Sequence, residues 1–171
     1  MIDSPTCLGR MLPFSRGLVA IPAGFIAPVA LAVQCTVSVT PMNFGAYDIL
    51  SNIDTMSSGR VRVSCTLESA DPPAVRVTYT VTASTGSSNS FAGRTLRGPV
   101  DTLAYNLYTT SNYTTIWGNG SNATQAFLGG FTVNQGNPTR NASHTVYGRI
   151  TKLQDVGSGN YSDNITVTVT F

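Results

Sequence analysis

The last seven residues of the chain alternate apolar residues with threonine. Every second position is apolar, namely Ile165, Val167, Val169 and Phe171, with one threonine between each pair. Because side chains on a β-strand point to opposite faces in turn, this pattern predicts a strand with one apolar face and one threonine face. Chain ends fray unless something holds them, so we expect this strand to lie inside the fold or against a partner.

The same alternation recurs along the rest of the chain. It predicts strands at residues 35–39, 60–65, 74–81, 103–108 and 145–150. Turn-forming residues separate them at 57–59, 71–73, 86–89, 118–120 and 157–159. No apolar face repeats at the helical period for three turns. Short strands at regular spacing therefore predict an all-β protein built as an antiparallel sandwich or barrel.

Charged residues make up only 11% of the 171 residues, about half the usual share. The net charge is +2, and the sequence has no basic block that could follow a phosphate backbone. We therefore expect no nucleic-acid partner. Low charge combined with 42% apolar residues favours an extracellular or self-assembling protein over a cytosolic enzyme.

The N-terminal region has the pattern of a secretory signal peptide. Arg10 and Arg16 precede an apolar run at residues 18–32, and this run ends in Ala-Leu-Ala. A positively charged start, an apolar stretch and a small-residue cleavage site define such a peptide. A membrane anchor is the alternative. The run is shorter than the ~20 residues that a spanning helix needs, and two prolines interrupt it.

Cleavage would divide the chain into a signal peptide at residues 1–32, or from Met11 if translation starts there, and one exported domain at residues 33–171. The exported domain keeps two cysteines, Cys35 and Cys65, and such a pair predicts one disulfide. The bridge would close a loop of about thirty residues, worth roughly 3–4 kcal/mol. Metal binding is the competing interpretation, and two isolated cysteines with one histidine do not support it.

His144 is the sole histidine, so a catalytic triad or a zinc site would have to include it. Ser143 beside it fits the polar start of a strand, and we expect an ordinary surface histidine. The few carboxylates are scattered, and nothing in the sequence pairs them for glycoside hydrolysis. We expect no catalytic residues, no metal, no cofactor and no small-molecule substrate.

Three large aromatic residues, Tyr113, Trp117 and Phe127, lie in a turn-rich region. Most large aromatic side chains are mostly buried, which favours a place in the core. If they were exposed together, they would form an adhesive surface-binding loop, and we keep this as the alternative.

Several motifs follow one another along the domain. They are residues 35–39 (CTVSV), 43–48 (NFGAYD), 59–65 (GRVRVSC), 94–96 (RTL), 103–108 (LAYNLY), 117–120 (WGNG), 146–150 (VYGRI), Gln154 and 159–163 (GNYSD). With the two cysteines and the terminal phenylalanine, this set resembles the spore coat protein U domain, the domain of subunits in archaic chaperone–usher pili. The resemblance covers essentially all of residues 33–171.

The resemblance implies an immunoglobulin-like β-sandwich that lacks its last strand, which leaves an apolar groove and unpaired backbone groups. By the same resemblance, a periplasmic chaperone would lend a strand to this groove. At the outer-membrane usher, a segment of the neighbouring subunit replaces the chaperone's strand. By the same resemblance, the apolar face of the terminal strand would form one groove wall and contact the chaperone. This face consists of Ile165, Val167, Val169 and Phe171.

The resemblance also implies a disulfide between Cys35 and Cys65, but the segment before Cys35 departs from the family pattern. Polymerising subunits carry a donor strand there, whereas cleavage after Ala32 leaves only Val33 and Gln34. Two residues span at most ~7 Å, too little to fill a groove. This predicts a subunit that accepts a strand and gives none, as at a pilus tip.

Two alternatives remain open. Residues 18–33 could be retained as the donor strand, although their prolines and lack of polar alternation argue against it. The domain could also be a secreted coat protein, or an adhesin that acts outside a fibre. In every case we expect export through the periplasm to the cell surface.

Overall fold

The computed structural model describes residues 32–68 and 72–171, so residues 1–31 of the predicted signal peptide lie outside it. In chain order the elements are β1 (Val33–Thr40), β2 (Thr55–Leu67), β3 (Ala74–Ala83), the 3-10 turn η1 (Gly86–Ser88), β4 (Arg94–Arg97), β5 (Thr102–Tyr108), β6 (Phe127–Asn134), β7 (Thr139–Ile150) and β8 (Val167–Thr170). Within this part of the chain, no helix has the length and apolar character needed to cross a membrane.

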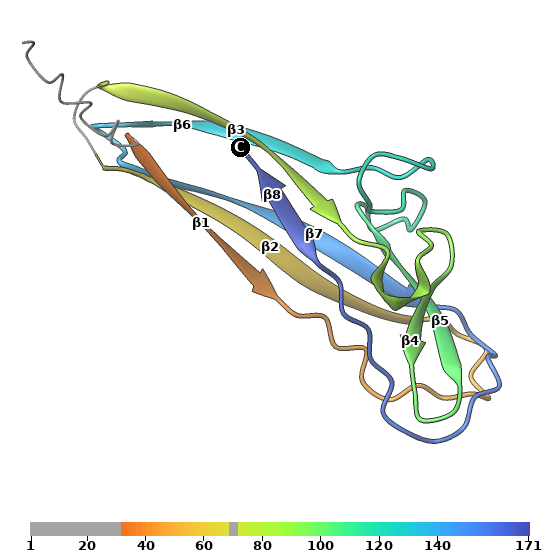
Figure 1. Cartoon of the computed structure of the whole chain (residues 1–171). Coiled ribbons are helices and arrows are strands. Elements are labelled where there is room, and N and C mark those ends of the chain that lie inside the picture. Colours follow the sequence, from red (N-terminus) through yellow and green to blue (C-terminus); the bar gives the residue numbers. More distant parts are fainter. Residues whose placement is uncertain (1–31, 69–71) are drawn as a thin grey trace, which may run out of the picture. The chain divides into compact units, whose positions relative to one another are not determined.

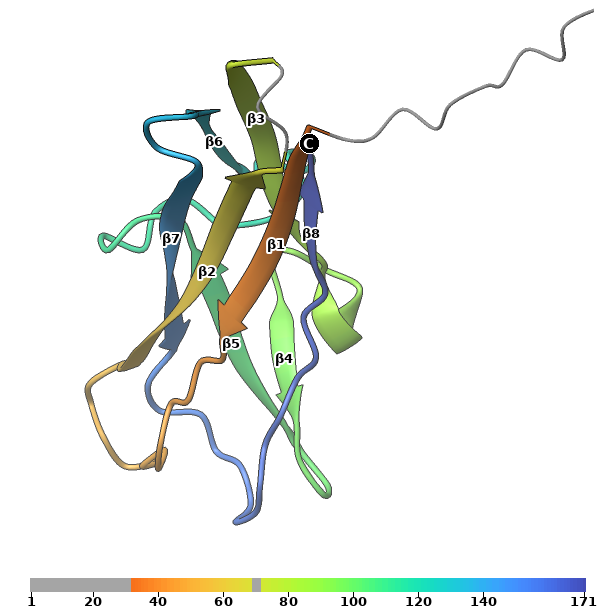
Figure 2. The ribbon, with the colours of Figure 1, turned by 90° about the vertical axis from the view of Figure 1, so that its left-hand side faces the viewer.

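The strands form two antiparallel sheets that pack face to face (Figure 1). One sheet has five strands in the order β1-β2-β7-β5-β4, and the other has three in the order β6-β3-β8. β1 and β8 are edge strands of the two sheets and run in opposite directions (Figure 2). The predicted all-β sandwich is confirmed.

The core lies between the inner faces of the two sheets and follows directly from the alternation. In β2, Val61 and Val63 point inward and are 1% and 0% exposed. In β3, Tyr79 and Val81 do the same from the opposite sheet. Burying such side chains contributes roughly 1.5–3 kcal/mol each, so these inner faces supply most of the stability of the sandwich.

The alternation pattern did not predict two of the strands, β4 and β6, and one predicted turn is wrong. β4 has a buried arginine at an inward position, and the centre of β6 has two adjacent glycines, Gly129 and Gly130. Gly129 is required because the ring of Tyr79 packs directly over it. Residues 57–59, predicted as a turn, lie within β2, where they pair with β7.

The predicted disulfide joins the first two strands. Cys35 and Cys65 are register partners on β1 and β2, and their sulfur atoms are bonded at 2.05 Å. β2 is the strand to which β1 is hydrogen-bonded. The bridge therefore fixes an edge strand to its sheet.

Replacing both cysteines with alanine should lower the free energy of unfolding by about 3–4 kcal/mol. The reason is the loop entropy of the unfolded chain, because the two cysteines are separated by 30 residues. Urea unfolding of the double variant beside the oxidised protein measures this. Wild-type protein with its disulfide reduced is the matched control, and equal stability of the oxidised and reduced proteins would contradict the prediction.

Candidate functional site: a groove between β1 and β8

A groove lies where the edge strands β1 and β8 pass into their neighbouring connections, and it is lined by Val39 and Thr40 of β1 and by Val167 of β8. One wall consists of residues 39–49, which begin in β1 and continue into the β1–β2 connection. The other wall consists of residues 156–167, which lead into β8. The hollow between the walls has a volume of about 1010 Å³. We call it the β1–β8 groove.

Apolar core side chains form the floor of the groove. They are Val61, Leu96, Leu103, Tyr105, Leu107, Trp117, Val146 and Ile150. Trp117 is 2% exposed, and its indole Nε1 donates to the carbonyl of Val81 at 3.2 Å. The indole nitrogen of Trp117 is therefore already paired, and an inserted segment would meet the apolar part of the ring.

β1 contributes an apolar face that its own sheet leaves uncovered. Val37 and Val39 are 42% and 50% exposed, although their register partners on β2 are fully buried. β1 pairs with β2 through one edge, and no strand in the described part of the chain pairs with its other edge. Both the side chains and the backbone of β1 are thus available to another strand.

β8 faces β1 with a similar edge. It pairs with β3 from Ala83–Val167 to Thr80–Thr170, and its second edge has no partner strand among the described residues. Ile165 and Val167 line the groove, whereas Val169 and Phe171, which the family resemblance also assigns to this wall, are not among its lining residues. Phe171 extends this apolar face beyond the hollow and is 58% exposed, so the final residue does not lie inside the fold.

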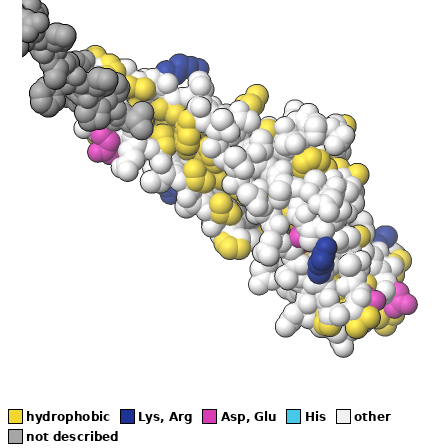
Figure 3. All heavy atoms as spheres, in the orientation of Figure 1, with side chains coloured by type: hydrophobic (Ala, Val, Ile, Leu, Met, Phe, Trp, Pro, Cys, Tyr) yellow, Lys and Arg dark blue, Asp and Glu magenta, His cyan; other side chains and the backbone are white. Residues whose placement is uncertain are grey.

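The two edges that face the groove carry none of the usual protection against strand pairing. Neither β1 nor β8 contains a charged residue or a proline, the residues that normally blunt an exposed edge. By contrast, the outer edge of β4 is covered, because Arg97 and Ser162 exchange two backbone hydrogen bonds of 2.7 and 3.0 Å. Figure 3 shows a band of hydrophobic side chains on the face that carries β1 and β8.

The β1–β2 connection packs two side chains onto the floor. Met42 and Phe44 lie over Gly148, where a Cβ atom would collide with both. Phe44 also meets Tyr105 edge to face, with ring centroids 6.0 Å apart. A glycine in β7 therefore allows the chain to cover part of its own groove floor.

Asp163 fixes the second wall to the core. Its carboxylate accepts hydrogen bonds from the hydroxyl of Tyr105 at 2.7 Å and from the backbone N–H of Ser87 and of Asn164, both at 2.9 Å. Burial and the bond to Asp163 raise the pKa of Tyr105, so its hydroxyl remains a donor. The wall is thereby held at a constant distance from the floor.

Arg94 lies beneath this region and is 0% exposed. Its guanidinium donates to Asn106 Oδ1 at 2.8 Å and to the carbonyls of Ser84 and Trp117 at 2.7 and 2.9 Å. It also lies over the ring of Phe91 at 5.3 Å. Burial lowers the pKa of Arg94. The arginine thus positions Trp117, and with it part of the groove floor.

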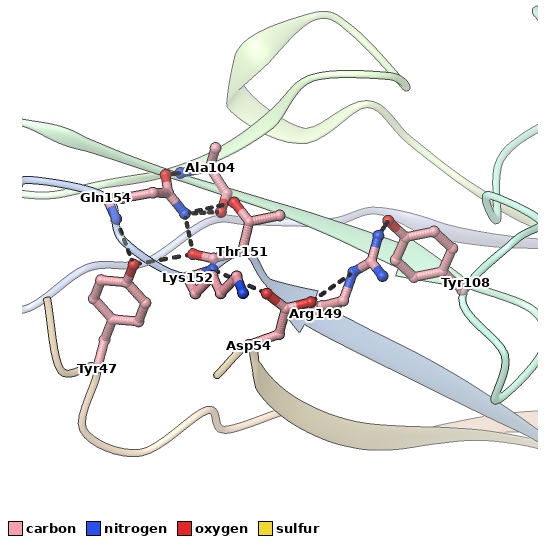
Figure 4. A network of polar contacts seen from close by, with 8 residues as sticks. All are labelled: Tyr47, Asp54, Ala104, Tyr108, Arg149, Thr151, Lys152 and Gln154. Carbon is pink, nitrogen blue, oxygen red and sulfur yellow. Dashed lines mark hydrogen bonds and ion pairs between the residues drawn. The ribbon is translucent and has the colours of Figure 1, made fainter. Parts of the chain in front are cut away.

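The β1–β2 connection, which forms one wall, is joined to the start of the β7–β8 connection, which leads into the other wall (Figure 4). The hydroxyl of Tyr47 donates to the carbonyl of Thr151 at 2.9 Å and accepts from the backbone N–H of Gln154 at 2.8 Å. The side chain of Gln154 in turn holds both the N–H and the carbonyl of Ala104 in β5, at 2.7 and 2.8 Å. We call this set of contacts the Tyr47–Gln154 clamp.

Sequence reasoning did not identify the clamp, Arg94 or Asp163 as functional. Tyr47, Arg94, Gln154 and Asp163 all lie in the motifs that carry the family resemblance, but alternation assigns them no role. Their partners are mostly backbone atoms distant in the sequence, such as the Ala104 amide for Gln154 and the Trp117 carbonyl for Arg94. A linear pattern contains no signal for such contacts.

The predicted surface-binding loop of Tyr113, Trp117 and Phe127 does not exist as one exposed patch. Trp117 is buried and packs against Phe127 at 5.5 Å, because its large ring fills the space between the two sheets. Tyr113 lies elsewhere, half-buried against Tyr108 at 5.5 Å and near the guanidinium of Arg149. The core interpretation therefore holds for Trp117, and the adhesive-loop alternative is wrong for it.

His144 is not the surface histidine that the sequence suggests. β7 begins at Thr139, earlier than predicted, and this places His144 on the inner face, in register with Val61. Its Nε2 lies 3.1 Å from the hydroxyl of Tyr79, and its ring stacks at 4.9 Å on Phe127. Burial lowers its pKa. In the part of the chain that the structure covers, no three His, Cys, Asp or Glu residues cluster as metal ligands would.

The protein should lose stability as the pH falls from about 7.5 to about 5.5, through the ordinary histidine pKa of about 6.5. The pKa of His144 is lower in the folded state, so the unfolded chain binds more protons in this window. Stability is therefore complete above the unfolded pKa and falls below it. Urea unfolding at both pH values, with His144→Phe as the comparison, tests this. An equal pH dependence in the variant would contradict the assignment to His144.

A second surface feature lies at the loop end of the sandwich, the end that carries the β1–β2, β4–β5 and β7–β8 connections (Figure 2). The exposed apolar side chains there are Leu50 at 84%, Ile53 at 74%, Val100 at 91% and Leu153 at 58%. Hydrogen bonds fix these loops, as between Asp48 Oδ1 and the N–H of Leu50 at 2.9 Å. Leu153 is held at a φ of 58°, where bulky residues are rare.

Comparison with known proteins agrees with this architecture. The family model described as the Spore Coat Protein U domain matches residues 23–168. The chain belongs to the spore coat protein U domain family. It is 32% identical over 138 residues to Protein U of Myxococcus xanthus, an alignment that covers 76% of this chain and 71% of Protein U.

The fold of this spore coat protein U domain is also found in a solved structure. The match is a chain in the crystal structure of the CsuC–CsuE chaperone–tip adhesion subunit pre-assembly complex, from the archaic chaperone–usher Csu pili of Acinetobacter baumannii. The TM-score is 0.51, the identity is 19%, and the alignment covers 81% of this chain. It covers only 40% of the matched chain. At this identity the likeness shows a shared fold.

Proposed function

We propose that this protein is a non-enzymatic, exported structural subunit of a bacterial surface pilus, assembled by donor-strand complementation. The observation that carries the proposal is the β1–β8 groove. Two uncharged strand edges without partners among the described strands face each other across an apolar floor. Such a site suits one occupant, an extended segment with alternating apolar side chains supplied by another polypeptide.

The partners that fit this site are a periplasmic chaperone, an outer-membrane usher and neighbouring subunits. The family membership supports the proposal, and so does the shared fold with a chain from a pilus chaperone–subunit complex. Backbone hydrogen bonds to β1 and β8 would provide affinity. The apolar face of Ile165, Val167, Val169 and Phe171 would provide register and contact the chaperone strand.

Titration of the purified protein with a synthetic peptide of alternating threonine and valine tests the proposal. We expect saturable binding and a higher melting temperature. At a peptide concentration about 100-fold above Kd, the stabilisation is about 2.7 kcal/mol, which corresponds to several degrees. A peptide of the same composition in scrambled, non-alternating order is the control. A monomeric protein that melts cooperatively and binds neither peptide would overturn the proposal.

The position in the fibre depends on the exported N-terminus. β1 begins at Val33, the residue that follows the predicted cleavage site. If export leaves Val33 first, the subunit accepts a strand without supplying one, as a tip subunit would. Mass spectrometry of the exported protein decides this, because a mature chain that begins near Leu18 would retain a possible donor segment.

The loop end supports a second candidate function, an adhesin-type binding module that acts at a fibre tip or outside a fibre. Leu50, Ile53 and Val100 present large apolar side chains to solvent on loops that hydrogen bonds hold in place. Several large apolar side chains exposed at one end of a protein are a candidate contact surface.

Replacing Leu50, Ile53 and Val100 with serine should reduce retention on an apolar bead surface while leaving strand-peptide binding unchanged. Replacing the exposed threonines Thr168 and Thr170 of β8 with serine controls for a general change of surface. Equal retention of the loop variant and the wild-type protein would rule out this candidate.

A further inference from the structure

We propose that Tyr47 is a positioning residue that sets the register of the strand bound in the β1–β8 groove, by closing the groove at one end. This inference rests on the proposed function, because it concerns the strand that the groove receives. It assigns a role to the clamp that neither the family membership nor the shared fold provides.

The first support is the place of the clamp along the groove. One wall leads from β1 at Val39 to Tyr47. The other leads from β8 at Val167 back to Val156. Tyr47 itself lines the groove, and its hydroxyl bridges to Thr151 and Gln154, which lie just before Val156, where the opposite wall begins. At the other end, Phe171 is exposed and no comparable bridge joins β1 to β8 among the described residues.

The second support is the rigidity of the clamp. Gln154 Oε1 accepts from the N–H of Ala104 at 2.7 Å, and its Nε2 group shares its two hydrogens among three acceptors, the carbonyls of Ala104 and Thr151 and the Thr151 hydroxyl, at 2.8 to 3.0 Å. Ala104 belongs to β5, an interior strand of the five-stranded sheet. Tyr47 therefore bonds to a segment that is itself fixed to the sheet, and an advancing strand would meet a fixed obstacle.

The third support is the physical need for a register signal. A one-residue slip turns every apolar side chain of a strand away from the floor, whereas a two-residue slip preserves the pattern. The floor itself is apolar, so it can contact the apolar face of a strand in either of two registers that are two residues apart. A stop at one end resolves this ambiguity, because it fixes how far the strand can advance.

Cross-linking with a peptide that has no register of its own tests the inference. The probe is a set of peptides of alternating threonine and valine, about twelve residues or roughly 40 Å long. Two lysines keep one end in solvent and so fix the direction. Each peptide has one cysteine in place of a different threonine. The protein is the full chain with Cys7→Ser and Thr168→Cys, since Thr168 is exposed on the outward face of β8.

With Tyr47 present, we expect disulfide cross-linking at one dominant peptide position. With Tyr47→Ala, the product should spread to positions two residues away, and the preference for the first position should fall about tenfold with the loss of two hydrogen bonds. Tyr113→Ala removes a half-buried tyrosine away from the groove and should keep the single position.

An unchanged distribution in Tyr47→Ala would overturn the role of Tyr47 while leaving the proposed function intact. Failure of every peptide to cross-link to the protein that retains Tyr47 would overturn the proposed function itself. If Tyr47→Ala does not fold, Tyr47→Phe removes both hydrogen bonds and keeps the ring. For that variant the same spread is expected, and its absence counts against the inference.

Discussion

Replacing Arg94 with alanine is expected to lower the free energy of unfolding by about 3–5 kcal/mol, the largest stability loss that we predict for a single substitution. The variant leaves the carbonyls of Ser84 and Trp117 without the donor that they have in the native protein. It also opens a cavity in place of a fully buried side chain. Urea unfolding measures the loss directly.

Arg97→Ala is the matched control for this experiment. Arg97 lies on the same strand but is exposed, and it donates one side-chain hydrogen bond, to the carbonyl of Ser87 at 3.0 Å. Exposed substitutions of this kind usually change stability by about 0.5 kcal/mol or less. A similar loss in both variants would mean that the buried hydrogen bonds of Arg94 contribute no more to stability than the exposed one of Arg97.

Placing a carboxylate on the groove wall should nearly abolish strand binding. In Val167→Asp, a bound strand would cover the new side chain, which must then be protonated or remain unpaired in apolar surroundings. Protonating a carboxyl group with an ordinary pKa of about 4 costs roughly 4 kcal/mol at pH 7. Allowing for residual solvent contact, we expect the affinity for the alternating peptide to fall about 100-fold or more.

The neighbouring position provides the control, because Thr168 points to the opposite face of β8 and is exposed. Thr168→Asp adds the same charge one residue away, and we expect its effect on affinity to be within a few-fold. Isothermal titration of both variants with the peptide measures the difference. Equal affinities for the two variants would show that the strand does not lie against the apolar face of β8.

The residues that the sequence placed correctly are those whose environment depends on a strand's own periodicity. Val61 and Val63 alternate with arginines and are buried, and Ile165 and Val167 alternate with threonines and line the groove. β6 was not predicted because Gly129 interrupts the alternation of apolar and polar residues. The need for a glycine there comes from Tyr79 on another strand. His144 was misplaced because β7 begins before the predicted strand and so includes it, on the same face as Val146.

The sequence by itself determined the all-β class, the pairing of Cys35 with Cys65 and the apolar face of the last strand. Alternation and the number of cysteines can be read directly from the order of residues along the chain. The tertiary structure alone decided that the edges of β1 and β8 lack partner strands among the described residues, that Arg94 is buried beneath Trp117, and that Tyr47 bonds to Gln154. These features depend on which distant strands become neighbours and on hydrogen bonds to backbone atoms, and neither is encoded in the spacing of residue types.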